Sequence, residues 1–261
     1  MQPGDLTEDF VADYAARWED QPGADDTRAL RHISMLGNPT LALLRLFGRL
    51  AAGQVLELGP YTGGSTTAVA LGLKDVGAGR ILTVELGGAY KSHPSHGSLD
   101  ILADLDRNLT RFGVRDLVNI LRGRHDALST IRRVKAQLQP KSVKLLVLDM
   151  DGCVGRDFWN YEPYLADDCL FVFDDYVSTG SDKGPRTKAW VDRAITRGLV
   201  DTLGVYEWGT WFGRLRRRPT ELERLRWSHI EVWGDSGALG VFKARLGMWR
   251  RFGSYYPPYD M

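Results

Sequence analysis

The chain has 261 residues, 43% of them hydrophobic, which is enough to bury one large core. Its 34 basic and 33 acidic residues leave a net charge of +1, so no overall field attracts nucleic acid, and no apolar run is long enough for a transmembrane helix. Two cysteines, Cys153 and Cys169, argue against a disulfide framework, and together with an acidic N-terminus lacking an apolar signal core they predict a cytoplasmic protein.

The N-terminal part of the chain is predicted to be helical. One or two helices of mixed polarity cover residues from about 5 to 34. A further helix is predicted from residue 38 to about 52, with Asn38 as its cap and Pro39 at its first helical position. We expect residues 1–52 to form a helical cap on the remainder of the chain.

Strands and helices alternate from residue 53 onward. The predicted strands are 54–58, 80–85, 118–121, 143–148 and 169–173, and the predicted helices are 65–74, 99–112, 127–138, 157–165 and 185–197. This alternation predicts a parallel sheet with helices on both faces. The continuous apolar runs at 144–148 and 169–173 are typical of strands buried on both sides.

The end of the chain has a different character. Residues 205–215 alternate and are rich in aromatic residues, and 238–245 form another predicted strand. The arginine-rich segment between them contains Glu221 and Glu223, which favours a solvated helix over a nucleic-acid-binding one. We assign 53–217 to the core and 218–261 to an insertion, a last strand and an aromatic tail of the same domain. The tail, at 249–259, is expected to pack on a partner subunit in a homodimer.

Residues 55–66 are the most informative segment: a buried strand, a glycine-rich turn and the start of a helix. Glycine lets the backbone approach a ligand closely because it has no Cβ. Glu85, 26 residues after Gly59, ends the second strand and can accept hydrogen bonds from both hydroxyls of a ribose. These features predict a nucleoside-containing cofactor across two neighbouring strands, the alternative being a turn without a ligand.

The glycine spacing narrows the choice of cofactor. Gly59-x-x-x-Gly63-Gly64 differs from the dinucleotide fingerprint, which disfavours a nicotinamide oxidoreductase, and no Lys-Ser/Thr follows to make a Walker loop. Glu57 places an acid within the strand, which suits a cationic cofactor without phosphates. S-adenosylmethionine fits this description.

Residues 57–65, with the sequence ELGPYTGGS, resemble the E-L-G-x-Y-x-G-x-S motif of class I S-adenosylmethionine-dependent methyltransferases. The resemblance runs from about residue 35 to about 215 and is closest to the catechol-type O-methyltransferases and their bacterial relatives that act on natural products or sugars. It implies a Rossmann-like α/β fold: a mostly parallel seven-stranded sheet, helices on both faces and an antiparallel strand pair at the C-terminal end.

The resemblance also implies which residues hold the cofactor. Glu57, Gly59, Tyr61 and Ser65 would contact the methionine half, Gly63 would permit close approach, Glu85 would bind the ribose, and Arg124, His125 and Asp126 would surround the adenine. Met35 and Gly37 lie in a segment that relatives close over the reactive methyl, and Asp149 is assigned to both cofactor and metal. Two alternatives stay open: His125 as a partner of a helix cap, and residues 35–38 as an ordinary turn.

Two strand ends carry carboxylates, Asp149 and Asp151 on one and Asp174 and Asp175 on the next. Parallel strands direct both ends to the same edge of the sheet, where the acids would repel one another without a cation. Mg²⁺ prefers such all-oxygen ligands. The resemblance implies that Asp149, Asp174 and Asp175 hold the metal; the alternative is capping and hydrogen bonding within loops.

In the expected reaction the metal binds two acceptor oxygens, lowers the pKa of a hydroxyl and orients it toward the sulfonium methyl. Many relatives place Lys or His three residues after the first metal-binding Asp, but this chain has Gly152 there. The neighbouring Asp151 is our predicted proton acceptor, with His125 and His32 as alternatives. The predicted catalytic residues are therefore Asp149, Asp151 and His125.

The acceptor is expected to be a hydroxyl of a sugar or small natural product. The loop 87–100, with His93 and His96, and the loop 177–185 overhang the predicted site. Tyr176, Trp208 and Trp211 are either stacking residues for the acceptor or core residues. A metal-independent N- or O-methyltransferase, or a non-catalytic scaffold with this fold, are the competing interpretations.

Overall fold

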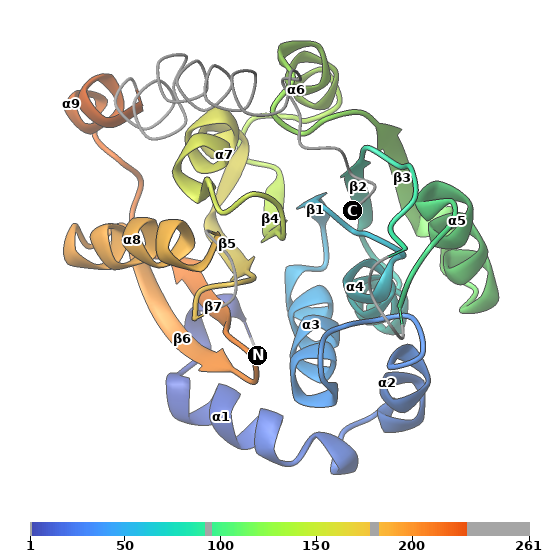
Figure 1. The fold of residues 1–261 in the computed structure, drawn as a ribbon. Coiled ribbons are helices and arrows are strands. Elements are labelled where there is room, and N and C mark those ends of the chain that lie inside the picture. The colour runs from blue at the N-terminus through green and yellow to red at the C-terminus, as the bar shows by residue number, and fades with distance from the viewer. Residues whose placement is uncertain (1, 92–95, 178–182, 229–261) are drawn as a thin grey trace.

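The computed structural model describes residues 2–91, 96–177 and 183–228, and its centre is one seven-stranded sheet (Figure 1). In chain order the strands are β1 (Gln54–Leu58), β2 (Arg80–Glu85), β3 (Val118–Arg122), β4 (Val143–Leu148), β5 (Leu165–Phe173), β6 (Val200–Tyr206) and β7 (Thr210–Leu215). Their order in the sheet is β3-β2-β1-β4-β5-β7-β6, and only the β5–β7 and β6–β7 pairs are antiparallel. The predicted Rossmann-like fold is confirmed.

Helices cover both faces of this sheet (Figure 1). In chain order they are α1 (Glu8–Ala16), α2 (Ala24–Leu30), α3 (Asn38–Ala51), α4 (Gly64–Val76), α5 (Ile101–Arg111), α6 (Leu128–Lys135), α7 (Val154–Tyr161), α8 (Lys183–Thr196) and the single turn α9 (Glu221–Glu223). The buried residues of α3, α4 and α5 belong to one apolar cluster, and those of α6, α7 and α8 to another. The sheet separates the two clusters.

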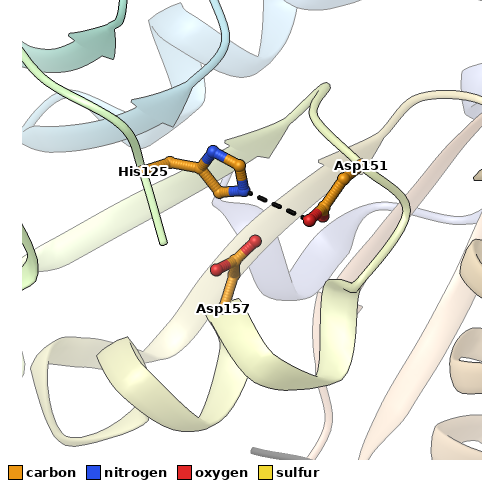
Figure 2. Close-up of side chains that lie close together, drawn as sticks. All are labelled: His125, Asp151 and Asp157. Atoms are coloured by element: carbon orange, nitrogen blue, oxygen red, sulfur yellow. Dashed lines mark ion pairs between the residues drawn. The ribbon is translucent and has the colours of Figure 1, made fainter. Parts of the chain in front are cut away.

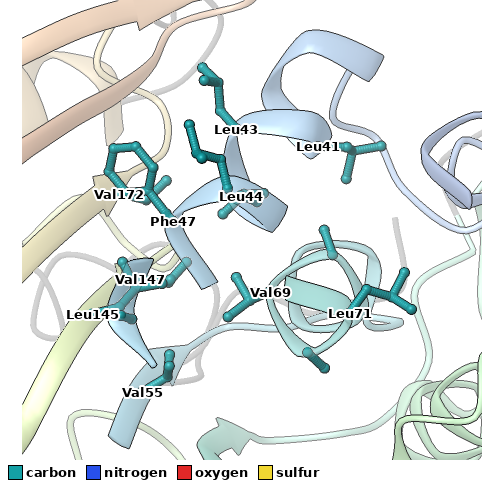
Figure 3. Packing of buried hydrophobic residues seen from close by; sticks show 14 of the residues in the cluster. Leu41, Leu43, Leu44, Phe47, Val55, Val69, Leu71, Leu145, Val147 and Val172 are labelled. Atoms are coloured by element: carbon teal, nitrogen blue, oxygen red, sulfur yellow. The ribbon is translucent and has the colours of Figure 1, made fainter. Parts of the chain in front are cut away.

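Successive strand residues enter opposite clusters, as the pleat of a strand requires. Val55 of β1 lies with α3 and α4, whereas Leu56 and Leu58 lie on the face of α7 and α8. Figure 3 shows the first cluster, in which Phe47 of α3 and Val69 of α4 lie beside Val55 and the residues of β4 and β5. Burial on both faces explains the apolar runs in the sequences of the central strands.

The helices before β1 are continuous with this core. Leu6, Val11 and Leu30 are buried in the same cluster as Val55 and Leu145. The predicted cap at 1–52 therefore shares its apolar interior with the sheet, and the domain boundaries stay predictions. No helix among the described residues is both long and apolar enough to cross a membrane.

The antiparallel pair differs from the one expected. Residues 205–215 are not one strand: a turn at Glu207–Gly209, with φ of 48° at Glu207 and 116° at Gly209, divides them between β6 and β7. The pair is thus a hairpin of 200–206 and 210–215. The predicted strand at 238–245 and the aromatic tail at 249–259 lie outside the described residues.

The start of α3 also differs from the prediction. Asn38 is the first helical residue, Gly37 is the cap, and Pro39 takes the second position. The backbone N–H of Thr40 donates to Glu207 Oε2 at 3.2 Å. A carboxylate from the hairpin thus accepts from one N–H of the first turn and complements the positive end of the helix dipole. Elsewhere the predicted boundaries shift by a few residues, the largest changes being the earlier end of α7, at Tyr161, and the earlier start of β5, at Leu165.

Candidate functional site

The turn between β1 and α4 lies against the end of β4. Gly59 has φ of 86°, and a Cβ there would lie 2.1 Å from the carbonyl oxygen of Asp149 and 2.4 Å from Met150 Sδ. Any larger residue would push the turn away from the loop that follows β4. Gly63, with φ of 93°, is the cap of α4. Gly59 therefore allows the two loops to meet at one edge of the sheet, and the predicted close approach to a cofactor stays a prediction.

Glu57 of β1 forms hydrogen bonds that connect this turn to the neighbouring elements. Its side chain is buried, and it accepts hydrogen bonds from Ser65 Oγ (2.7 Å), Thr66 Oγ1 (2.7 Å) and Thr83 Oγ1 (2.9 Å). Burial raises the pKa of Glu57, and the three hydroxyl donors partly offset this rise. Glu57 and Ser65 thus bind each other and join β1, β2 and α4; their contact with the methionine half stays a prediction.

Glu85 stands at the end of β2, beside the turn. Its Oε2 accepts from the backbone N–H of Tyr61 at 3.2 Å and its Oε1 from that of Gly87 at 2.9 Å. Burial raises the pKa of this carboxyl, and the backbone donors lower it again. Because each carboxylate oxygen can accept more than one hydrogen bond, Glu85 keeps the capacity to accept two hydroxyls.

Tyr61 connects the turn to the loop after β2. Its ring meets that of Tyr90 edge-on, with centroids 5.8 Å apart, and its hydroxyl donates to the carbonyl of His96. The ring of His96 is in turn 3.1 Å from the carbonyl oxygen of Arg31. The loop after β2 therefore contacts both the turn between β1 and α4 and the N-terminal segment. His93 lies outside the described residues.

The side chains of the segment after β3, residues 124–126, have different surroundings. Arg124 and Asp126 form an ion pair with each other, with Arg124 Nε 2.7 Å from Asp126 Oδ1. His125 turns inward: it is buried, and its Nε2 lies 3.6 Å from Asp151 Oδ2 (Figure 2). The structure therefore brings His125 to the loop after β4, while the contact of Arg124 and Asp126 with the adenine stays a prediction.

Arg156, at the start of α7, binds two of the acids near His125. It donates to Asp151 at 2.7 and 3.0 Å and to Asp157 at 2.9 and 2.7 Å. Burial alone would raise the pKa of Asp151, but His125 and Arg156 bring it below its usual range. Burial raises the pKa of Asp157 despite Arg156.

This arrangement bears on the predicted role of Asp151 as proton acceptor, which stays a prediction. A carboxylate whose pKa is lowered and which accepts two hydrogen bonds from an arginine is a poor base. Figure 2 shows His125, Asp151 and Asp157 facing one another. The guanidinium of Arg156, which is not drawn there, donates to both acids. The cluster links the loop after β3 to the loop after β4, and the catalytic roles predicted for Asp151 and His125 stay predictions.

The other three acids converge at the ends of β4 and β5. Oxygens of Asp149, Asp174 and Asp175 lie within 4.8 Å of one another. Thr210 Oγ1 donates to Asp174 Oδ1 at 2.6 Å. Lys183 Nζ lies 3.6 Å from Asp149 Oδ1 and 3.3 Å from Asp175 Oδ2. Burial and the charge of Asp174 raise the pKa of Asp149 to about 7.

These acids border a cavity of about 290 Å³. Its lining residues come from five separate parts of the chain: Met35, Leu36, Gly37, Thr40, Asp149, Asp174, Asp175, Lys183, Glu207, Trp208 and Thr210. The predicted segment with Met35 and Gly37 is thus brought to the three aspartates. Asp151 and His125 do not line this cavity.

The aromatic residues divide between the two roles considered for them. Trp211 is fully buried in the core, while Trp208 is 79% exposed and borders the cavity. Tyr176 is half-buried and donates its hydroxyl to Asp192 at 2.8 Å. Sequence reasoning missed Lys183, Glu207 and Arg156, because a single charged residue in a loop or at a helix start gives no periodic signal.

Comparisons with known proteins agree with this geometry. Residues 56–176 match the family model described as a methyltransferase domain. The sequence matches none of the curated proteins. Among solved structures, the chain is similar to the SAH-bound methyltransferase PaMTH1 of Podospora anserina, with 16% identity, a TM-score of 0.55, and coverage of 79% of this chain and 95% of that one.

Two further structures show the same fold. The O-methyltransferase TomG of Streptomyces achromogenes, in complex with SAM, has 17% identity and a TM-score of 0.54, covering 83% of this chain and 99% of its own. A putative caffeoyl-CoA O-methyltransferase of Staphylococcus aureus has 14% identity and a TM-score of 0.55, covering 80% and 98%.

The fold and the matched segment agree with each other. The strand order and the antiparallel β7 are those of the Rossmann-like methyltransferase fold. Residues 56–176 match a methyltransferase domain, and the chain shares its fold with methyltransferases that were solved with SAM or SAH bound.

Proposed function

We propose that this methyltransferase transfers a methyl group from S-adenosylmethionine to a hydroxyl of a sugar or small natural product, with a divalent metal ion, Mg²⁺, at its acidic site. The observation that carries the proposal is the convergence of Asp149, Asp174 and Asp175 on a cavity beside the cofactor turn. Three carboxylates whose oxygens lie within 4.8 Å of one another offer the all-oxygen ligands that a hard divalent ion prefers.

The cofactor and the metal have separate places in this proposal. The bound cofactor supplies an electrophilic methyl group, and the bound ion supplies Lewis acidity for the acceptor hydroxyl. Glu85 would accept the ribose hydroxyls, and Arg124 and Asp126 would border the adenine. Gly59 and Tyr61 would let the backbone approach the methionine half. The side chains of Glu57 and Ser65 keep that backbone in place.

The chain's own residues orient the acceptor. Asp149, Asp174 and Asp175 would hold the metal, and Asp149 is the catalytic residue retained from the sequence prediction. Trp208 and Met35 offer apolar surface in the cavity, and Glu207 offers a polar group for further hydroxyls. A cavity of mixed polarity suits a glycosylated or hydroxylated metabolite. Asp151 and His125 would act by positioning the loops, because their side chains bind elsewhere.

Calorimetric titration and an acceptor screen test the proposal. We expect the protein to bind S-adenosylmethionine and S-adenosylhomocysteine, and to methylate a hydroxyl acceptor in a reaction that a chelator abolishes and Mg²⁺ restores. Full activity with the chelator would favour the metal-independent N- or O-methyltransferase. Absence of cofactor binding would favour a non-catalytic scaffold.

A homodimer and a cytoplasmic location belong to the same proposal. The two cysteines of the chain are free, which is compatible with a reducing compartment. The net charge of only +1 supports a small-molecule acceptor over nucleic acid. Sedimentation analysis that finds only monomer would contradict the dimer.

A further inference from the structure

Lys183 is the cationic side chain that contacts the aspartate site. It is the first residue of α8, and its Nζ lies between an oxygen of Asp149 (3.6 Å) and one of Asp175 (3.3 Å). Asp149 follows β4 and Asp175 follows β5, so the lysine spans the two strand ends. The same two carboxylates are the ones assigned to the metal.

The position of Lys183 is fixed by the backbone as well as by charge. Gly152, in the loop after β4, has φ of 76°, and a Cβ there would lie 2.5 Å from the carbonyl oxygen of Lys183. The loop and the first turn of α8 are therefore in direct backbone contact, which only glycine permits. The start of α8 is held against the loop that carries Asp149, and the lysine side chain projects into the aspartate site from there.

The charges at this site do not balance. Asp149, Asp174 and Asp175 bring three carboxylates together, and Lys183 supplies one positive charge. The negative charge that Lys183 leaves uncompensated would attract a divalent cation. That cation would need the same carboxylate oxygens that the lysine ammonium already contacts. Two cations only a few ångströms apart in a partly buried site repel each other strongly.

We propose that Lys183 is a built-in counter-ion of the aspartate site, which a divalent cation must displace from Asp149 and Asp175, so that this lysine sets the metal affinity. The inference rests on the metal site of the proposed function. It accounts for the placement of an ammonium between two of the three carboxylates and for the glycine at position 152, which admits the start of α8.

The test measures metal binding by the full-length protein without cofactor or acceptor. Mn²⁺ is titrated into the wild type and Lys183→Met, and free Mn²⁺ is followed by electron paramagnetic resonance. We expect Lys183→Met to bind Mn²⁺ about tenfold more tightly or better, because a repelling charge has been removed. Lys183→Arg, which keeps the charge, is expected to stay close to the wild type.

Lys188→Met is the matched control. Lys188 lies on the same helix and pairs with Asp192 at 2.8 Å, away from the three aspartates, so the same loss of charge there should leave Mn²⁺ binding unchanged. Asp174→Asn should weaken binding in both backgrounds and thereby place the ion at this site. Lys183→Gln provides a second neutral variant if the methionine variant fails to fold.

The outcomes separate the inference from the function on which it rests. Tighter Mn²⁺ binding in the neutral variants supports the inference. Equal binding in wild type and neutral variants overturns it and leaves the metal site standing. No Mn²⁺ binding in any variant overturns both the metal site and the inference, while titration of S-adenosylmethionine into the same samples reports separately on the methyltransferase proposal.

Discussion

Replacing Thr83 by valine tests whether the hydroxyl donors around Glu57 hold the cofactor turn. The substitution keeps the shape and the strand preference of a fully buried residue in β2 and removes one hydrogen bond of 2.9 Å to a buried carboxylate. A hydrogen bond to a charged group contributes about 1.5–3 kcal/mol, so we expect unfolding to become easier by this amount. For a chain of this size the loss corresponds to a fall in Tm of roughly 3–12 °C.

Helix α4, which packs on the same sheet, offers a control. Thr67 of α4 is also fully buried, but its Oγ1 has no hydrogen-bond partner. Thr67→Val should therefore be neutral or stabilising, because it removes an unsatisfied polar group. Urea unfolding of both variants and the wild type measures the difference. If Thr83→Val were no less stable than Thr67→Val, the role assigned to the Glu57 cluster would be wrong.

The loss in Thr83→Val should also depend on pH. Burial raises the pKa of Glu57 in the folded protein, and Thr83 is one of the donors that lower it again. Without this donor the folded pKa rises further above the unfolded value, and a raised carboxyl pKa costs stability as pH increases. The deficit of Thr83→Val should therefore be larger at pH 8 than at pH 5.

Three other substitutions test other parts of the site. Arg156→Met should cost about 3–5 kcal/mol, because it leaves the buried Asp157 without its cation and removes the cation from the half-buried Asp151, and it should cost more at pH 8 than at pH 5, because protonation relieves the acids; urea unfolding showing a loss under about 1 kcal/mol contradicts this. Glu85→Ala should weaken S-adenosylmethionine binding by about tenfold or more in calorimetry, with the fold intact by circular dichroism, and unchanged affinity would remove Glu85 from the cofactor site. Gly59→Ala should lower Tm far more than Gly77→Ala, because both have positive φ but only Gly59 has a backbone oxygen in the way; equal losses would show that the close approach is unimportant.

The sequence predicts the parallel part of the fold closely, because its strands have signals of their own. Strands β1, β2 and β4 begin and end at the expected residues, and the glycine turn after β1 marks the cofactor edge. The hairpin was missed because alternation continues across its turn and only Gly209 marks the reversal. Its strands depend on pairing with β5, which local sequence does not encode.

The candidate site is less predictable than the fold. Asp149, Asp174 and Asp175 could be grouped because they follow neighbouring strands, which fixes where they emerge. Asp151 is only two residues from Asp149, yet its direction depends on the loop before α7 and on Arg156. Lys183 comes from the start of a helix, and its approach to the aspartates depends on how α8 packs against Gly152.

The wall of the cavity lies largely outside the matched methyltransferase segment. That segment ends at residue 176, whereas Met35 and Gly37 precede it and Glu207 and Trp208 follow it. Proteins of this kind can therefore keep one cofactor cradle while their acceptors diverge through these two flanking segments. The hydrogen bond from the Thr40 N–H to Glu207 joins these two flanks, so exchanging one flank without the other would break it.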